Sequence, residues 1–212
     1  MGRHQRRARH GSRRKTAPAV KNGVVQRKNR HARTAQAPMI FRARPEAGFR
    51  RVVTRTDVLR FIDLIPDWPE LSIGLREIHL VGGELGWDGF YEFSTESPYS
   101  AILLAPWLSE ADDPDHVWAA DYVEGHAETL DRLGVERALR DDGDWHMTFT
   151  DDQIRAWQLL HIFLHELGHH VDRMTTRRRR EISRGEDFAE RFAFERERRM
   201  WPEYRRAFGL RG

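Results

Sequence analysis

The charge of this chain is divided between two segments, and that division limits where a folded domain can form. Lysine and arginine supply 14 positive charges within residues 1–45, where no aspartate or glutamate occurs. The formal net charge of the whole chain is only +3, so residues 46–212 carry −11. The basic segment also has few large apolar side chains and cannot bury enough surface to offset the entropy lost on ordering. We therefore expect a disordered basic arm over residues 1–45 and one folded domain over residues 46–212.

The composition of the chain is compatible with one folded domain. Of its 212 residues, 39% are apolar, which suffices for a single hydrophobic core. The chain has no cysteine, so disulfides are excluded and a metal site must use histidine and carboxylates. No apolar run has the length of a signal-peptide core or a membrane span. We expect a cytoplasmic protein that does not bind membranes, although export by another route stays open.

Apolar spacing and turn residues predict an α+β domain. The expected elements, in chain order, are a helix from Thr56 to Pro66, strands at 78–81, 87–93 and 101–104, a helix after Pro114 that reaches Leu133, a helix from Thr150 to about Met174, and a final helix from Gly185 that ends before Pro202. The apolar stripe of the first helix consists of Val58, Leu59, Ile62 and Ile65.

The helix after Thr150 has the clearest start signal. Thr150 and Gln153 match a capping box, in which the two side chains satisfy backbone donors at the helix N-terminus. Apolar residues then recur at helical spacing at Ile154, Trp157, Leu160 and Leu164. This pattern predicts a rigid, partly buried helix.

The same helix carries His165-Glu166-Leu167-Gly168-His169, a His-Glu-x-x-His motif. Its two histidines are four residues apart, so both imidazoles project from one face and can bind one tetrahedral ion. Glu166 then points toward the water on that ion, whose pKa zinc lowers to about 7. The motif predicts a zinc-dependent hydrolase with His165 and His169 as ligands and Glu166 as the general base. A histidine-rich helix without a metal is the alternative.

The third protein ligand must come from elsewhere in the chain. Glu186 and Glu190 are one turn apart on the final helix, beside its apolar residues. From spacing alone, either carboxylate can bind zinc while the other orients a ligand imidazole. An ordinary charged helix is the competing interpretation of this segment.

Together the two motifs resemble those of gluzincin-type zincin metallopeptidases. The segment His-Glu-Leu-Gly-His-His-Val-Asp, followed by Glu-x-x-Ala-Glu-x-Phe-Ala, is most similar to the anthrax lethal factor-like and Pro-Pro endopeptidase group and to the ImmA/IrrE metallopeptidases. The resemblance covers residues 150 to about 195. It implies a zincin-like domain with a small sheet over the active-site helix, Zn²⁺ as cofactor, Glu186 as third ligand and Glu190 as a supporting acid.

One feature departs from the lethal factor-like pattern. That group has a tyrosine shortly before the third ligand, which stabilises the tetrahedral oxyanion, whereas this chain has arginines at 177–180. Any fixed donor aimed at the developing negative charge could serve, so Arg179 and His161 are candidates for oxyanion or substrate contacts. The alternatives are a solvated arginine loop and, for His161 and His170, surface histidines.

The resemblance also implies an edge strand that pairs with an extended substrate. We assign this role to residues 101–104, with a simple core strand as the alternative. The expected partner is a protein or peptide substrate. Non-specific binding of nucleic acid or another polyanion through residues 1–45 is possible on charge alone. Two other functions fit the sequence, a nucleic-acid-associated regulatory metalloprotein and a zinc-stabilised interaction module without turnover. The sequence leaves the oligomeric state open.

Overall fold

The structure is a computed structural model that describes residues 37–83, 88–97, 99–109, 117–176 and 184–210, together with the backbone of 20–21 and 24–25. The chain divides into two compact units, residues 1–34 and 35–212. In the first unit, β1 (Val20–Lys21) and β2 (Val24–Val25) form an antiparallel pair. The rest of the predicted arm up to residue 36 lies outside the described residues.

The second unit begins earlier than the charge pattern indicated. Strand β3 (Met39–Arg42) pairs in parallel with β5 (Glu77–Leu80), with Ile40 opposite Ile78. The placement of residues 39–42 in a disordered arm was therefore wrong. Met39 and Phe41 are exposed, but Ile40 packs against the core and the strand is hydrogen-bonded to β5 along its length. The neighbouring arginines obscured this signal.

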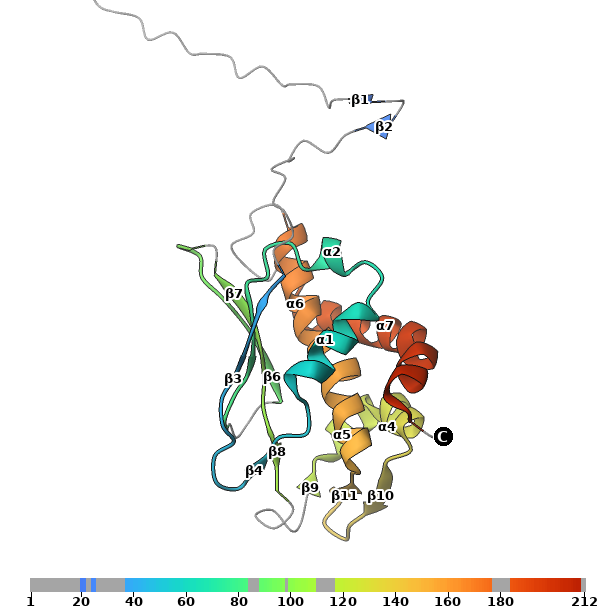
Figure 1. The fold of residues 1–212 in the computed structure, drawn as a ribbon. Coiled ribbons are helices and arrows are strands. Elements are labelled where there is room, and N and C mark those ends of the chain that lie inside the picture. Colours follow the sequence, from blue (N-terminus) through green and yellow to red (C-terminus); the bar gives the residue numbers. More distant parts are fainter. Residues whose placement is uncertain are drawn as a thin grey trace, which may run out of the picture. The chain divides into compact units, whose positions relative to one another are not determined.

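A mixed four-stranded sheet forms one layer of the second unit (Figure 1). Its order is β3-β5-β7-β6, where β6 is Gly89–Phe93 and β7 is Ser100–Leu104. β5 and β7 are parallel, and β6 runs antiparallel to β7 with Tyr91 opposite Ile102. The sheet confirms the α+β class, and β5, β6 and β7 lie within two residues of their predicted bounds.

The strand predicted to form the sheet edge is central. β7, which contains residues 101–104, lies between β5 and β6, so β6 is an edge of the sheet instead. The residue pattern explains the difference. β7 is an almost continuous buried apolar run, which is typical of a strand flanked on both sides, whereas β6 alternates between buried Tyr91 and exposed Phe90 and Glu92.

Two smaller sheets extend the domain. β4 (Phe49–Arg50) pairs with β8 (Trp107–Leu108), and β9 (Val117–Trp118), β11 (Trp145–Thr148) and β10 (Glu136–Leu139) form a three-stranded antiparallel sheet. The sequence analysis did not predict β10 and β11. Gly143, with φ of 93°, lies in the turn between them.

The helix predicted after Pro114 is interrupted and starts later. Val117 lies in β9, and the helical region consists of α3 (Ala120–Gly125) and α4 (Ala127–Leu133), with the break at His126. Gly134 ends α4 in the left-handed conformation, at φ of 69°. Val123, Leu130 and Leu133, which the apolar spacing placed on one helix face, are buried. They belong to two helices and not to one.

Helix α1 (Arg55–Asp63) starts at a capping box formed by Thr54 and Asp57. The short helix α2 (Trp68–Leu71) follows it in the chain. Its predicted apolar stripe was partly wrong. Leu59 is 40% exposed, whereas Phe61 is fully buried and makes an edge contact with Phe163, at 5.7 Å between ring centroids. Phe61 precedes Ile62 in the chain, and its side chain widens the buried face of α1.

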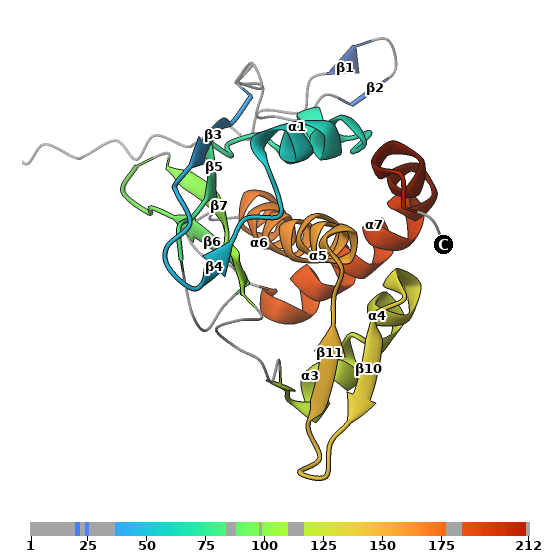
Figure 2. The same cartoon turned by 60° about the horizontal axis from the view of Figure 1, so that its bottom comes forward.

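The predicted helix from Thr150 forms one continuous helical rod through the centre of the unit. It consists of α5 (Asp151–Ala156), the π-helical segment η1 (Trp157–Ile162) and α6 (Phe163–Thr175). The capping box of Thr150 and Gln153 is present. Figure 2 shows this rod between the mixed sheet and the C-terminal helix. All six η1 residues are buried, as expected for a helix covered on every side.

The final helix, α7 (Gly185–Phe208), continues past its predicted end. Pro202 lies inside it, and Gly209, at φ of 72°, ends it instead. Tertiary packing explains why the proline does not terminate the helix. Tyr204 is fully buried, 6.0 Å from the ring of Phe61, and so holds the last two turns on the core.

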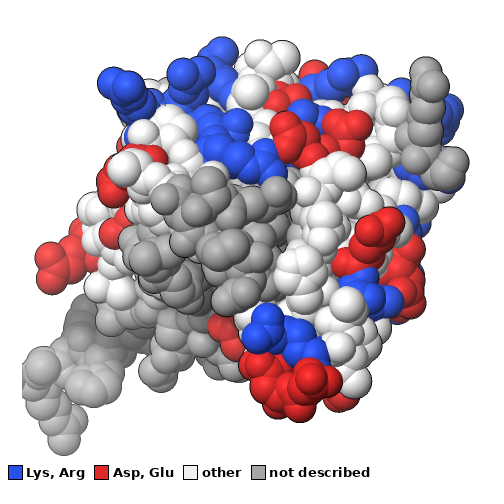
Figure 3. Space-filling model, turned by 90° about the horizontal axis from the view of Figure 1, so that it is seen from below, with Lys and Arg blue, Asp and Glu red and all other residues white. Residues whose placement is uncertain are grey.

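The described surface carries charges of both signs. On the face drawn in Figure 3, groups of acidic and basic residues lie next to one another. Several charged side chains of the described residues form ion pairs, among them Arg50 with Asp151 and Arg155 with Asp152. Among the described helices, none is long and apolar enough to cross a membrane.

A close backbone approach between α6 and α7 depends on a glycine within the histidine motif. A Cβ atom at Gly168 would lie 2.8 Å from Cα and 3.1 Å from the carbonyl oxygen of Ala189. Both are backbone atoms, so neither can move aside without displacing α7. Gly168 therefore sets the distance between the helix that carries the histidines and the helix that carries the glutamates.

We predict that Gly168→Ala destabilises the domain by about 1–3 kcal/mol, because the added methyl group must push the helices apart. Urea unfolding of both proteins measures this difference. Gly125→Ala is the matched control, since a Cβ there meets nothing within 4 Å and alanine favours helix. A Gly168 variant as stable as the control would contradict the proposed packing.

Candidate metal centre

Three side chains from α6 and α7 converge at one point. His165 Nε2 lies 3.1 Å from His169 Nε2 and 3.1 Å from Glu186 Oε2. His169 Nε2 lies 3.4 Å from the other carboxylate oxygen, Glu186 Oε1. The residues predicted as ligands are thus brought together by the packing of the two helices, and they form a group that could hold a metal ion.

These separations suit a tetrahedral cation. Nitrogen and oxygen ligands lie ~2.0–2.2 Å from zinc, so two ligands of a tetrahedral ion are about 3.3 Å apart. The observed 3.1–3.4 Å between donor atoms matches that value. Two imidazole nitrogens that face each other repel unless a proton or a cation lies between them. The donor set therefore fits a metal.

The group is open on one side. The side chain of His169 is 8% exposed, whereas that of Glu186 is 80% exposed. A site held by three protein groups with one accessible side leaves room for water or substrate, as catalytic zinc sites do.

Glu166 lies beside this group on a buried part of α6. A Cβ at Gly89 of β6 would be 3.0 Å from Glu166 Oε1, so the absence of a side chain at Gly89 makes room for the carboxyl group. Burial raises the pKa of Glu166 to about 7. The charge of His165 and a hydrogen bond from the backbone of Tyr91 act in the opposite direction and lower the pKa. The negative charge of Glu186 raises it further. The carboxyl group is thus poised to exchange a proton near neutral pH.

Glu190 contacts the far side of the His165 ring. Its Oε2 lies 2.9 Å from His165 Nδ1, so that nitrogen donates and Nε2 is directed at the other donor atoms. Burial alone would lower the pKa of His165, but the hydrogen bond to Glu190 and the carboxylates of Glu166 and Glu186 raise it overall. Without a metal, the site thus favours a proton on His165, and a metal would displace that proton.

The start of α7 is held by a buried acid on α6. Asp172 Oδ2 accepts from the backbone N–H groups of Arg184 at 2.7 Å and Gly185 at 3.1 Å, and Oδ1 accepts from Arg184 Nε at 2.8 Å. Burial raises the pKa of Asp172, yet these hydrogen bonds outweigh it and lower the pKa overall. Asp172 thereby fixes the turn that positions Glu186 one residue after Gly185.

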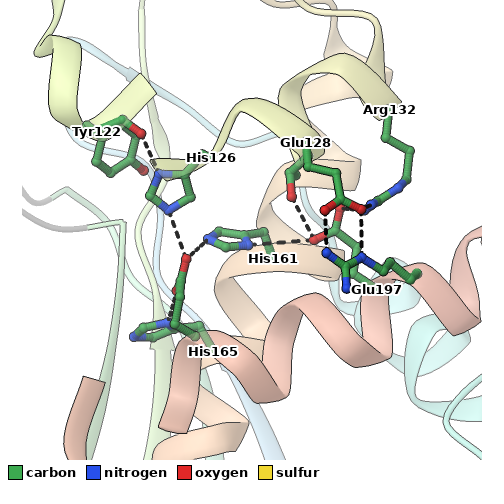
Figure 4. A network of polar contacts seen from close by, with 10 residues as sticks. Tyr122, His126, Glu128, Arg132, His161, His165 and Glu197 are labelled. Atoms are coloured by element: carbon green, nitrogen blue, oxygen red, sulfur yellow. Dashed lines mark hydrogen bonds and ion pairs between the residues drawn. The ribbon is translucent and has the colours of Figure 1, made fainter. Parts of the chain in front are cut away.

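A second group of polar side chains lies next to the first. His126 Nε2 is 3.4 Å and His161 Nε2 is 3.8 Å from Glu190 Oε1. Figure 4 shows His126 and His161 on different elements, with Glu197 beyond His161. Burial lowers the pKa of His126, partly opposed by its hydrogen bond to the Tyr122 carbonyl. These three residues form another group that could hold a metal.

Other candidate residues lie elsewhere or outside the described residues. His161 does not form the rim of the first group or the helix surface, because it is buried at 2% exposure. His170 is also buried rather than at the surface. It is 2.9 Å from the Tyr91 hydroxyl and 3.2 Å from the Ile73 carbonyl, and burial lowers its pKa to about 4. Arg179 and the other residues of 177–180 lie outside the described part of the chain.

His126 and the roles of Asp172 and Gly89 were not predicted from the sequence. Asp172 follows the histidine motif by three residues, so its position was a usable signal. His126 had none, because it lies at a break between helices that sequence periodicity does not reveal.

No model of a known protein family, no curated protein and no solved structure matches the chain at a significant level.

We predict that Asp172→Ala lowers the free energy of unfolding by about 2–3 kcal/mol, because it leaves the backbone donors of Arg184 and Gly185 without their buried acceptor. It should also weaken zinc binding, since the first turn of α7 carries Glu186. Urea unfolding and zinc titration test both effects. Asp187→Ala is the control in the same turn, because Asp187 is exposed. Its effect should stay below about 1 kcal/mol, and equal effects of the two changes would contradict the role of Asp172.

The raised pKa of Glu166 predicts that the stability of the metal-free protein depends on pH. A carboxyl group whose folded pKa lies above its unfolded value binds more protons when folded, so stability falls as pH rises from about 4.5 to about 7. At pH values above that range, the ionised Glu166 lowers the free energy of unfolding by roughly 3 kcal/mol. In EDTA, Glu166→Gln should therefore gain stability relative to the unaltered protein on going from pH 5 to pH 8, as measured by urea unfolding. A difference that does not change with pH would contradict the burial of an ionisable Glu166.

Proposed function

We propose that this protein is a zinc-dependent metallopeptidase of the zincin type, which hydrolyses peptide bonds in a protein or peptide substrate. His165, His169 and Glu186 would hold the ion, and Glu166 would be the general base. The resemblance to the anthrax lethal factor-like and ImmA/IrrE groups supports this proposal, as does the α+β fold with the motif helix packed beside a mixed sheet.

One observation carries the proposal most. The donor atoms of the three ligands lie 3.1–3.4 Å apart with one side open, and the buried carboxyl of Glu166 lies next to them. A structural zinc site has closed coordination and does not need a buried carboxyl group beside it. This combination favours hydrolysis over a zinc-stabilised interaction module.

Each residue of the proposed site has its own role in hydrolysis. A zinc ion in this site would lower the pKa of its bound water and polarise the substrate carbonyl. Glu166 would accept the proton of the attacking water and then donate it to the leaving amine. Glu190 keeps the His165 ring in the orientation that directs Nε2 at the site.

The sheet offers one edge beside this site. β6 is an edge strand, and its Gly89 is in close contact with Ile162 and Glu166 of the central helical rod. An extended peptide could add to such an edge by backbone hydrogen bonds, whatever its side chains. We therefore assign to β6 the substrate-pairing role that the sequence analysis gave to residues 101–104.

We predict that Glu166→Gln retains zinc and fold but loses about a hundredfold to ten-thousandfold in peptide hydrolysis, because glutamine has the same shape and no basicity. A peptide-library digest identifies a substrate for the unaltered protein, and its turnover is then compared between the two proteins. Zinc content is measured in the same samples. Glu195→Gln, on α7, is a control for the loss of one glutamate charge and should leave turnover unchanged.

Near-normal turnover by a fully zinc-loaded Glu166→Gln variant would contradict the proposed general base. If the library yields no cleaved peptide with the zinc-loaded, unaltered protein, the interaction module without turnover is the better account.

A further inference from the structure

Three elements bring His126, His161 and Glu190 together around one carboxylate oxygen. His126 lies between α3 and α4, His161 in η1, and Glu190 on α7. Both histidine Nε2 atoms face Glu190 Oε1, His126 at 3.4 Å and His161 at 3.8 Å. Figure 4 shows the two imidazoles directed at the same carboxylate oxygen from separate elements. Three polar side chains from distant parts of the chain thus meet at one point.

The backbone fixes the proton position on His126. Its Nδ1 lies 2.7 Å from the carbonyl oxygen of Tyr122, which can only accept, so Nδ1 carries the proton. In the neutral imidazole Nε2 then has a free lone pair. That lone pair is directed at a carboxylate oxygen, which is also an acceptor. Two facing acceptors are stable only with a proton or a cation between them.

His161 is in a similar position, with an acid behind it. Its Nδ1 lies 3.7 Å from Glu197 Oε2, too far for a hydrogen bond, and this buried nitrogen has no hydrogen-bond partner among the described residues. Glu197 is satisfied by other groups, since Thr129 Oγ1 donates to it at 3.0 Å and Arg132 forms an ion pair with it. The unpartnered Nδ1 lies on the Glu197 side of the ring, so Nε2 is the nitrogen that faces Glu190 in this buried position.

The separations from Glu190 Oε1 are longer than those of ordinary hydrogen bonds. At 3.4 and 3.8 Å, the contacts exceed the mode of about 2.9–3.0 Å for N–H···O hydrogen bonds. The 3.4 Å contact matches the ~3.3 Å between two ligands of a tetrahedral ion, and the 3.8 Å contact would shorten by about 0.5 Å on binding. We propose that His126, His161 and Glu190 form a second binding site for a divalent transition-metal ion.

The surroundings of the three ligands agree with this assignment. Metal-binding histidines usually donate their other ring nitrogen to a carbonyl or carboxylate. His126 does so to Tyr122, and a slight shift of His161 would bring Nδ1 within reach of Glu197. Glu190 can serve both sites, because Oε2 accepts from His165 while Oε1 faces the second site.

The position of the site suggests what the ion would do. His161 lies in the π-helical segment, a feature that is frequent at functional sites in helices. The side chains of His126 and Glu190 are 15% and 29% exposed, so an ion can enter from solvent. A bound ion would link the α3–α4 junction, the central rod and α7. It would also hold Glu190, and through it the ring of His165, in place.

Metal stoichiometry of the full chain tests the proposal, with Zn²⁺ as the probe. We expect two zinc ions per chain in the unaltered protein, by elemental analysis after dialysis against micromolar zinc. His126→Ala should remove one ion and His169→Ala the other, and the double variant should bind none. His146→Ala, on β11, is the control and should keep both ions. Circular dichroism and thermal melting establish that each variant is folded.

A second readout does not depend on removing a side chain. In histidine side-chain ¹⁵N spectra of the zinc-loaded unaltered protein, His126 should have a protonated Nδ1 and a metal-bound Nε2. One zinc per chain in both the unaltered protein and the folded His126→Ala variant would overturn the proposal, as would two ions in that variant. So would a His126 Nε2 that does not shift when zinc is added.

The second site does not rest on the proposed function. Loss of zinc in His126→Ala but not in His169→Ala would support the second site and contradict the catalytic one. Two bound ions without any cleaved peptide would leave the second site standing while the proposed peptidase activity failed.

Discussion

The packing of α7 against α6 is the contact on which the candidate site depends. Because Gly168 has no side chain, the backbone of Ala189 can lie close to α6. Asp172 then anchors the turn before α7 through three hydrogen bonds. With the distance and the starting point of α7 both fixed, Glu186 meets His165 and His169, and Glu190 meets the other side of His165. Two residues within and just after the histidine motif thus position the carboxylates that complete it.

Local signals predicted the elements that carry the site. The capping box at Thr150, helical spacing and the His-Glu-x-x-His motif place both histidines and Glu166 on one rod, and the start at Gly185 puts both glutamates on the next helix. Features that depend on tertiary contacts were not predicted. Pro202 lies inside α7 because Tyr204 is buried beyond it, and residues 101–104 are central because a parallel partner lies on one side and β6 on the other.

The second group of ligands was beyond sequence reasoning for the same reason. His126 is 35 residues from His161 and 64 from Glu190, with a strand hairpin between them, and no periodic pattern links positions across such a break. The histidine that looked like a surface residue, His161, is buried because η1 is covered on all sides. Spacing along one helix can reveal a pair of ligands, whereas convergence of three elements appears only in the folded chain.

Burial of so many ionisable groups lowers the stability of the metal-free fold. Glu166 is raised to a pKa of about 7, and His126 and His169 are held below their ordinary pKa values mainly by burial. A fold keeps such groups where a ligand offsets their cost or where chemistry needs them. Anomalous diffraction at the zinc edge from crystals of the zinc-loaded protein tests this account most directly. It predicts a peak within bonding distance of His165 Nε2, His169 Nε2 and Glu186, with Glu166 beside it and outside the coordination sphere. Zinc-loaded crystals with no peak there, or with Glu166 as a ligand in place of Glu186, would contradict it.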